Sequence, residues 1–176
     1  GLRTAEKKDS MGICFIGERN FVKFLQNYLP AQKGDMVDAD TGKKVGEHMG
    51  LMYYTIAQRR GLGIGGSGSG ERWYVSDKDM ERNILYVVQG GQNPKLASNG
   101  FSCTEAHFVN PLPDELRCTV KYRYQQTEKS CLLRKTSDGW ETLFDEAQIG
   151  VAPGQVGVYY RGEECLGGAI IDTVLK

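Results

Sequence analysis

The sequence predicts a mainly β protein: a short helical N-terminal part, a small α+β central domain and then an antiparallel β-barrel. Two observations predict this class. From residue 73 onward, segments of strand length follow one another, and glycine, proline, asparagine and aspartate separate them at spacings of about 8–12 residues. Before residue 73, helical periodicity is confined to one short segment, residues 18–29.

The helical segment comes first. Its apolar side chains recur at the spacing of one helix face, at Phe21, Phe24, Leu25, Tyr28 and Leu29. Pro30 ends the predicted helix, since proline disfavours the helical conformation of the residue before it. Residues 1–10 are polar and charged, which is typical of a linker or an arriving segment.

A hairpin and a loop region follow the predicted helix. Thr41-Gly42 is a turn signal, and the short segments 35–39 and 43–48 flank it. Residues 52–56 favour a β conformation. Residues 66–71, GSGSGE, have the composition of a flexible loop.

Eight segments of strand length make up the rest of the chain. They are residues 73–79, 83–90, 101–109, 116–126, 130–136, 140–145, 155–162 and 164–172. We therefore expect a linker with a cysteine segment over residues 1–19, a central connecting domain over 20–74 and the barrel over 75–176.

Composition limits the class of protein. The chain has 176 residues, no formal net charge, 40% hydrophobic and 25% charged residues, as in ordinary globular proteins of one domain or two small ones. No apolar run approaches the roughly 18 residues of a membrane span. The first residues contain neither a secretory signal nor an initiator Met, which is consistent with a processed or truncated piece. We expect a cytoplasmic protein without a membrane partner.

The five cysteines argue against a metal or disulfide framework. No two of them have the CxxC spacing of a zinc knuckle or a thioredoxin-like pair. An odd number of single cysteines fits reduced cytosolic thiols. His48 and His107 lie far apart in sequence, and we expect structural roles for both. The sequence therefore predicts no metal site.

One strand segment combines charge and aromatic rings. In KYRYQQ, residues 121–126, the alternation of a strand puts Lys121, Arg123 and Gln125 on one face and Tyr122, Tyr124 and Gln126 on the other. Arginine and lysine suit phosphates, and tyrosines can stack on bases. The pattern alone favours the alternative, a barrel strand with tyrosines in the core and charges in water. QRRG, residues 58–61, is a second basic cluster, for which a solvated turn is the favoured alternative.

Cys14 lies in the motif GICFIG. As a bare pattern it is most often a small buried hydrophobe. Gly12 and Gly17 bracket it, however, and a helix beginning near Glu18 would bring its positive end towards the sulfur and favour the thiolate. The glycine-rich residues 61–70 lack the GK[ST] ending of a phosphate loop and precede a strand, so we expect no nucleotide there.

Longer motifs resemble a known family. KKDSMGICFIGERNFVKFLQNYLPAQKGDMV is similar to the region that follows the catalytic domain in bacterial tRNA-specific 2-thiouridylases. The resemblance continues through GEHMGLMYYTIAQRRGLGIGG, WYVSDKDMERNILYVVQG, CTVKYRYQQ, VAPGQ and ECLGGAII, so it covers essentially the whole chain in order.

The resemblance implies an enzymatic activity. Such enzymes convert the wobble uridine of certain tRNAs, position 34, to 2-thiouridine: ATP adenylates the uridine O2, and a cysteine persulfide delivers sulfur to C2. By this resemblance Cys14 carries the persulfide, which it receives from a cysteine desulfurase or a relay protein. It can also form a disulfide with a cysteine of the N-terminal domain. A persulfide carrier needs an accessible sulfur of thiolate character.

The resemblance also assigns tRNA contacts. The family's Arg-Tyr pair matches Arg123 and Tyr124, and its glutamine in the APGQ turn matches Gln155. The implied barrel resembles those of translation factors. Two alternatives remain open: a non-catalytic tRNA- or RNA-binding barrel, and a translation-factor-like barrel that binds protein.

The sequence departs from the family pattern in places. The substituted positions are Met11 for threonine, Ala57 for the glycine of TIGQR, Asn93 in a usual His-Pro position and Gln125 for the second arginine of RYRQ. The SGGxDS-type loop of the family's ATP site is absent from the sequence. We therefore expect ATP to be bound by an N-terminal domain outside this chain, and the chain alone to be inactive.

Overall fold

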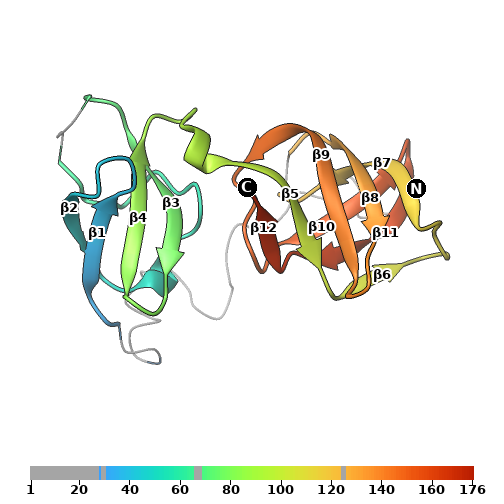
Figure 1. The fold of residues 1–176 in the computed structure, drawn as a ribbon, viewed down its shortest axis with the longest axis horizontal. Helices are drawn as coiled ribbons and strands as arrows, with labels where there is room; N and C mark the ends of the chain where they lie inside the picture. The colour runs from blue at the N-terminus through green and yellow to red at the C-terminus, as the bar shows by residue number, and fades with distance from the viewer. Residues whose placement is uncertain (1–27, 29–30, 66–68, 124–125) are drawn as a thin grey trace, which may run out of the picture.

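The computed structural model describes residues 28, 31–65, 69–123 and 126–176. The helix predicted over residues 18–29 and the cysteine segment 1–19 lie outside the described residues, apart from Tyr28 in a turn. The described part forms two β-sheets, a four-stranded sheet and an eight-stranded curled sheet (Figure 1). The predicted class, mainly β with a barrel, is confirmed.

The four-stranded sheet has the order β2-β1-β4-β3. β1 (Gly34–Asp38) and β2 (Lys44–His48) form the predicted hairpin. β4 (Ile84–Gln89) pairs in parallel with β1 and antiparallel with β3 (Trp73–Asp79). We call residues 34–89 the sheet domain.

The hairpin turn of the sheet domain is built by one aspartate. Asp38 accepts hydrogen bonds from the Asp40 amide at 3.0 Å and the Thr41 hydroxyl at 2.6 Å. Gly42, at φ 70°, supplies the left-handed residue that closes the loop, and its amide donates to the Asp38 carbonyl. The turn signal at Thr41-Gly42 therefore forms as predicted.

The β conformation predicted for residues 52–56 is wrong. The chain instead forms a short 3₁₀-helix, η1 (Leu51–Tyr53), after Gly50, whose φ is 137°. Burial explains the difference, because the turn carries both Leu51 and Tyr54 into the core of the sheet domain.

The curled sheet has the order β12-β5-β9-β8-β7-β10-β11-β6, and all its pairs are antiparallel. Its strands are β5 (Ala97–Cys103), β6 (Ala106–Phe108), β7 (Glu115–Lys121), β8 (Lys129–Lys135), β9 (Trp140–Ile149), β10 (Val156–Arg161), β11 (Glu164–Ile170) and β12 (Thr173–Leu175). The 3₁₀-turn η2 (Pro94–Leu96) leads into it. β12 lies beyond the last strand predicted, and the predicted strand 101–109 is divided into two.

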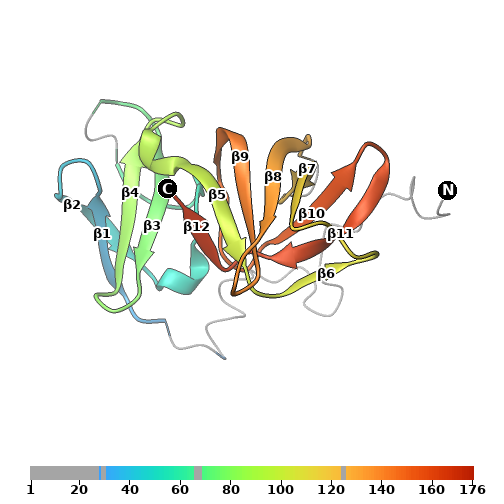
Figure 2. The same ribbon diagram turned by 45° about the vertical axis from the view of Figure 1, so that its right-hand side comes forward.

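Two bent strand pairs close this sheet into a barrel (Figure 2). β6 pairs with β11, and β5 pairs with β12, so β5–β6 and β11–β12 run side by side. Backbone bonds continue across both bends, from the Ile170 amide to the Glu105 carbonyl at 3.0 Å and from the Asp172 amide to the Ser102 carbonyl at 2.9 Å. The side chain of Asp172 also accepts from the Thr104 amide and hydroxyl. We call this contact the barrel seam.

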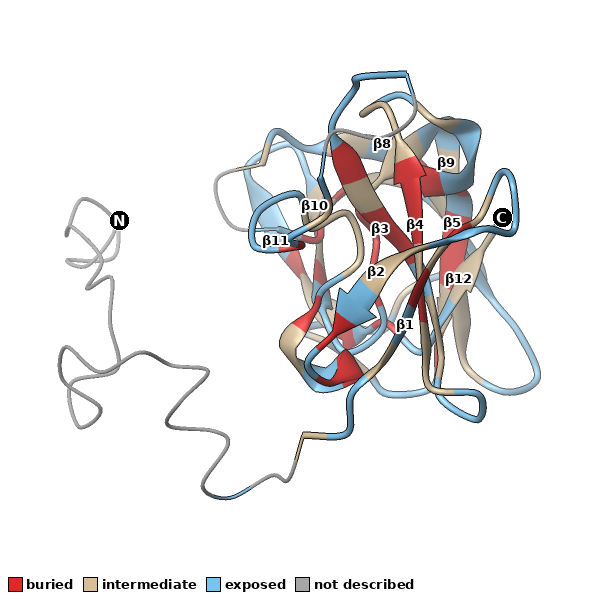
Figure 3. Cartoon of the chain, turned by 90° about the vertical axis from the view of Figure 1, so that its left-hand side faces the viewer, coloured by how far each residue is buried: buried red, intermediate tan, exposed pale blue. Residues whose placement is uncertain are grey.

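Each sheet has its own core, visible as buried segments in Figure 3. The barrel core is aromatic and aliphatic, and its fully buried members include Phe101, Val120, Leu133 and Tyr159. The core of the sheet domain centres on β3 and β4. The chain passes from one sheet to the other between Gln89 and Ala97, later than the expected boundary at residues 74–75.

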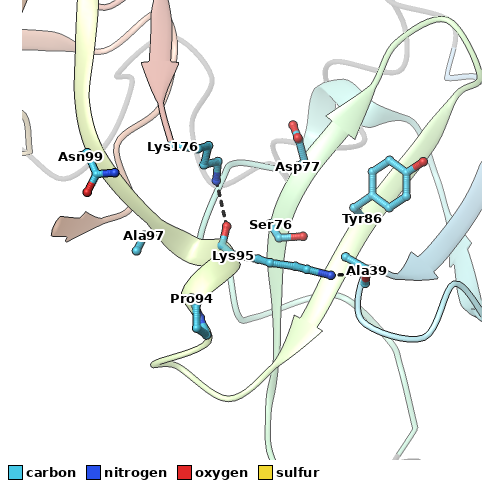
Figure 4. A pocket seen from close by; sticks show the side chains of 9 residues that line it. All are labelled: Ala39, Ser76, Asp77, Tyr86, Pro94, Lys95, Ala97, Asn99 and Lys176. Atoms are coloured by element: carbon cyan, nitrogen blue, oxygen red, sulfur yellow. Dashed lines mark hydrogen bonds between the residues drawn. The ribbon is translucent and has the colours of Figure 1, made fainter.

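Polar contacts join the two domains around a cavity of about 510 Å³ (Figure 4). Lys95 donates to the Ala39 carbonyl and pairs with Asp40 at 3.0 Å, while Lys176 donates to the Lys95 carbonyl at 2.8 Å. Asn93 also donates to Asp40, and the bonds from Lys95 and Asn93 lower the pKa of this carboxyl. In the described residues, no helix is long and apolar enough to cross a membrane.

The buried pair Thr142–Tyr159 offers a test of the barrel core. Their hydroxyls are 2.7 Å apart and both residues are fully buried. Thr142→Val or Tyr159→Phe alone leaves a buried hydroxyl without this partner. Each is expected to lower the free energy of unfolding by about 1–3 kcal/mol. Chemical denaturation of both variants and of the double variant measures the coupling, and additive losses would contradict it.

Candidate functional site

A groove of about 570 Å³ opens where β7 ends and β10 begins. We call it the barrel groove; its lining residues are Lys121, Tyr122, Arg123, Gln126, Gly154, Gln155, Val156, Val158 and Tyr160. Two of the three residues that the sequence predicts to contact tRNA, Arg123 and Gln155, therefore line one groove.

Strand register brings these two residues together. β7 and β10 are antiparallel, with Lys121 opposite Val158 and Thr119 opposite Tyr160. Continuing the same register past the end of β7 places Arg123 beside the start of β10, where Gln155 precedes the strand. The two residues therefore meet although 32 positions separate them.

Gln155 is held by its backbone. The Gly154 amide donates to the Ile171 carbonyl, and the Ile171 amide donates to the Gln155 carbonyl, both at 2.8 Å. Gly154 has φ 80°, which favours glycine in this turn. Ile171 lies at the bend of the barrel seam, so the seam fixes the turn and leaves the exposed amide side chain of Gln155 facing the groove.

Arg123 is exposed and reaches the sheet domain. Its Nη2 donates to the Ile56 carbonyl at 3.3 Å. Gly150 leaves the space that its guanidinium occupies, since a Cβ there would lie 2.6 Å from Nη2. No carboxylate among the described residues forms an ion pair with Arg123, so its remaining donors are available to an anion.

The other charged and aromatic groups of the groove are already engaged. Lys121 pairs with Glu128 at 3.3 Å and lies over the Tyr160 ring, 5.1 Å from its centroid. A hydrogen bond from the Thr119 hydroxyl lowers the pKa of Glu128. Tyr122 is a core residue, 2% exposed, and burial raises its pKa. The core interpretation of KYRYQQ therefore holds for Tyr122.

Two predicted site residues, Cys14 and Tyr124, lie outside the described residues. We expect structural roles for the histidines, and His48 is fully buried. Its Nε2 contacts the Asn83 carbonyl at 3.0 Å, and its Nδ1 accepts from the Gly50 amide at 3.1 Å. With both ring nitrogens occupied, His48 has a structural role. The part of the chain described contains no group of three potential metal ligands.

Sequence reasoning missed a cysteine pair. Cys118 and Cys131 face each other across β7 and β8, and their sulfurs are 3.8 Å apart, so both are free thiols. The hydrogen bond between them raises the pKa of Cys131 and lowers that of Cys118. Burial raises the pKa of a third thiol, Cys103, to about 11. The pair could have been found from the strand register of β7 and β8. The spacing of the cysteines along the sequence does not show which strands are neighbours.

The loop beneath Arg123 has an unusual backbone. Ala57 adopts φ 63°, a left-handed conformation that costs a non-glycine residue roughly 1–2 kcal/mol. Two hydrogen bonds to β3 hold it there: the Ala57 amide donates to Val75 at 2.8 Å, and the Val75 amide donates to Gln58 at 3.0 Å. The family that this sequence resembles has glycine at this position. The positive φ explains that preference.

Comparison with known proteins finds two domain families in order along the chain. Residues 22–89 match a tRNA methyl transferase PRC-barrel domain, and residues 98–171 match an aminomethyltransferase beta-barrel domain. The two matches divide the chain where the two sheets divide.

Three relatives that align with 99–100% of this chain are named tRNA-specific 2-thiouridylase. The protein of Alkaliphilus oremlandii is 52% identical over 179 residues, covering 100% of this chain and 49% of the relative. That of Pseudoalteromonas translucida is 55% identical, and that of Escherichia coli is 54% identical; both alignments cover 99% of this chain and 49% of the relative. The chain thus spans about half the length of these relatives.

The strained loop gives a stability test. Ala57→Gly relieves the left-handed strain, and the extra freedom of glycine in the unfolded chain offsets part of the gain. We expect the free energy of unfolding to rise by up to about 1 kcal/mol. Ala97→Gly is the control, because Ala97 has φ −81° and should lose stability. Urea unfolding compares the two variants, and equal losses would contradict the strain.

Proposed function

Because the chain belongs to the tRNA-specific 2-thiouridylase family, we propose that it is the tRNA-gripping and sulfur-carrying part of such an enzyme. The complete enzyme would thiolate C2 of the wobble uridine, position 34. The observation that carries this proposal is the 52–55% identity over 99% or more of the chain to proteins of that name. The sheet domain and the barrel are the parts of the chain that we propose to hold the tRNA.

The barrel groove is the proposed tRNA contact. Arg123 offers planar donors that suit phosphate oxygens, and it is free of carboxylate partners in the described structure. Gln155 offers an amide that both donates and accepts hydrogen bonds, as base edges and the 2′-hydroxyl require. Tyr124 is proposed as the stacking residue of the same segment.

Cys14 is proposed to carry the sulfur as a persulfide, supplied by a cysteine desulfurase or a relay protein. In the proposed transfer, the terminal persulfide sulfur bonds to C2 of the activated uridine, the C2–O2 bond breaks, and the activated oxygen leaves as part of AMP. A second cysteine then attacks the Cys14 sulfur and breaks the S–S bond. The uridine keeps the terminal sulfur, the two cysteines are left as a disulfide, and a thiol reductant must restore them.

ATP would supply the adenylation of the uridine O2. The glycine-rich segment 61–70 lacks the GK[ST] ending of a phosphate loop, and the strand β3 that follows it presents no helix N-terminus. We therefore assign ATP to a domain outside this chain. The chain alone is then proposed to bind tRNA in the cytoplasm without thiolating it.

Cys14→Ser in the complete protein tests the sulfur role. We expect 2-thiouridine in cellular tRNA to disappear, because serine cannot hold a persulfide, while tRNA binding persists. Mass spectrometry of digested tRNA from cells without another thiolase measures the product. Cys165→Ser is the matched control, since Cys165 is a free, exposed thiol on the barrel. Surviving thiolation in Cys14→Ser would leave the alternative, a non-catalytic RNA-binding module.

Arg123→Ala tests the groove. Loss of one phosphate contact should weaken tRNA binding about tenfold and reduce the slope of log affinity against log salt by about one. Arg134→Ala is the control, because Arg134 is a barrel arginine already paired with Glu141. Filter binding at several salt concentrations measures both variants. Equal effects of the two substitutions would contradict a tRNA contact at Arg123.

A further inference from the structure

The arginines of the described chain divide into two groups. One group forms ion pairs with carboxylates, at Arg82, Arg117, Arg134 and Arg161. The other has no such pair within the described residues; its members are Arg59, Arg60, Arg72 and Arg123. The guanidinium groups of this second group are not neutralised by an ion pair within the described residues.

Three of the unpaired arginines share one cavity on the sheet domain. Arg59 and Arg60 follow η1, and Arg72 directly precedes β3, yet all three line a space of about 520 Å³. We call it the arginine cavity. Glu71 is its one carboxylate, so three positive charges face one negative charge and two remain uncompensated. All three arginines are exposed.

The backbone of the arginine cavity is held in place. The side chain of Gln58 accepts from the Thr55 amide and donates to the Arg60 carbonyl, both at 2.9 Å. On the opposite wall, the Arg72 carbonyl accepts from the Gly90 amide at 3.0 Å. Guanidinium groups carried on a fixed backbone lose less freedom when they bind an anion.

A further donor lies in the wall of the cavity. Trp73 is 8% exposed, and its indole Nε1 is buried without a hydrogen-bond partner among the described residues. Buried indole N–H groups normally find a partner. Because this nitrogen is closed to solvent, it is an unsatisfied donor beside the cavity and is not counted among the partners of an anion there.

The loop that leads to the arginine cavity contacts Arg123 of the barrel groove. Arg123 donates to the carbonyl of Ile56, and Arg59 is three residues further along the same loop. Three residues span at most about 10 Å. The backbone of Arg59 therefore lies within about 10 Å of the Ile56 residue that Arg123 contacts.

We propose that Arg59, Arg60 and Arg72 form a second phosphate-binding site, which holds the backbone of the tRNA on the sheet domain while the barrel groove holds it on the barrel. The inference rests on the proposed function. An extended polyanion fits this arrangement because the charges are spread over an open cavity and continue across two domains.

The test uses the complete protein and an unmodified tRNA transcript. Arg59→Ala, Arg60→Ala and Arg72→Ala are combined in one variant. We expect affinity to fall about tenfold or more and the salt slope to fall by about two to three. The matched control combines Arg82→Ala, Arg134→Ala and Arg161→Ala, which removes the same charge from paired arginines. The control should change affinity less than threefold.

Two further measurements keep the outcomes distinct. Arg60→Glu changes one exposed side chain and should weaken binding by itself even if the triple variant fails to fold, which thermal unfolding reports. If Arg123→Ala weakens binding but the cavity variants match their control, this inference is overturned and the proposed function stands. If the wild-type protein shows no salt-dependent tRNA binding, both fail.

Discussion

The barrel seam is the contact on which the rest of the structure depends. Without it, β5 and β11 would be the free edges of an open sheet. The seam also carries Ile171, whose amide and carbonyl bond to the turn that presents Gln155. The same contacts therefore close the barrel and position Gln155, which is predicted to contact RNA. The hydrogen bonds that Thr104 donates to Asp172 at the bend fix the register between β5–β6 and β11–β12.

Local patterns in the sequence were enough for much of the fold. Turn residues such as Thr41-Gly42 and the punctuation after residue 73 predicted the hairpin and most barrel strands. They failed at residues 52–56, where burial of the η1 turn decided against a strand, and at β12, a three-residue strand formed by pairing with β5. Local propensity does not report burial in a core or pairing with a strand that is distant in sequence, which are the two causes here.

The candidate site was predictable to a different degree. Arg123 and Gln155 came from resemblance, and register then explained why they share a groove. Arg72 had no signal of its own, because its neighbours Arg59 and Arg60 are 12 or more positions away and the sheet domain brings them together. The Cys118–Cys131 pair is a similar case. Such sites depend on which strands are neighbours, and a single sequence does not state that.

The contacts between the domains have a thermodynamic consequence. Three of them are polar: Lys95 of the connecting turn with Asp40, Lys176 with the Lys95 carbonyl, and Arg123 with Ile56. Arg123 has five N–H donors, so a phosphate can bind it while the bond to Ile56 persists. A ligand held in this way favours the domain arrangement that keeps both bonds. By reciprocity, anything that fixes that arrangement strengthens the ligand's binding. The contact between Arg123 and Ile56 would then contribute to the affinity for an anionic ligand.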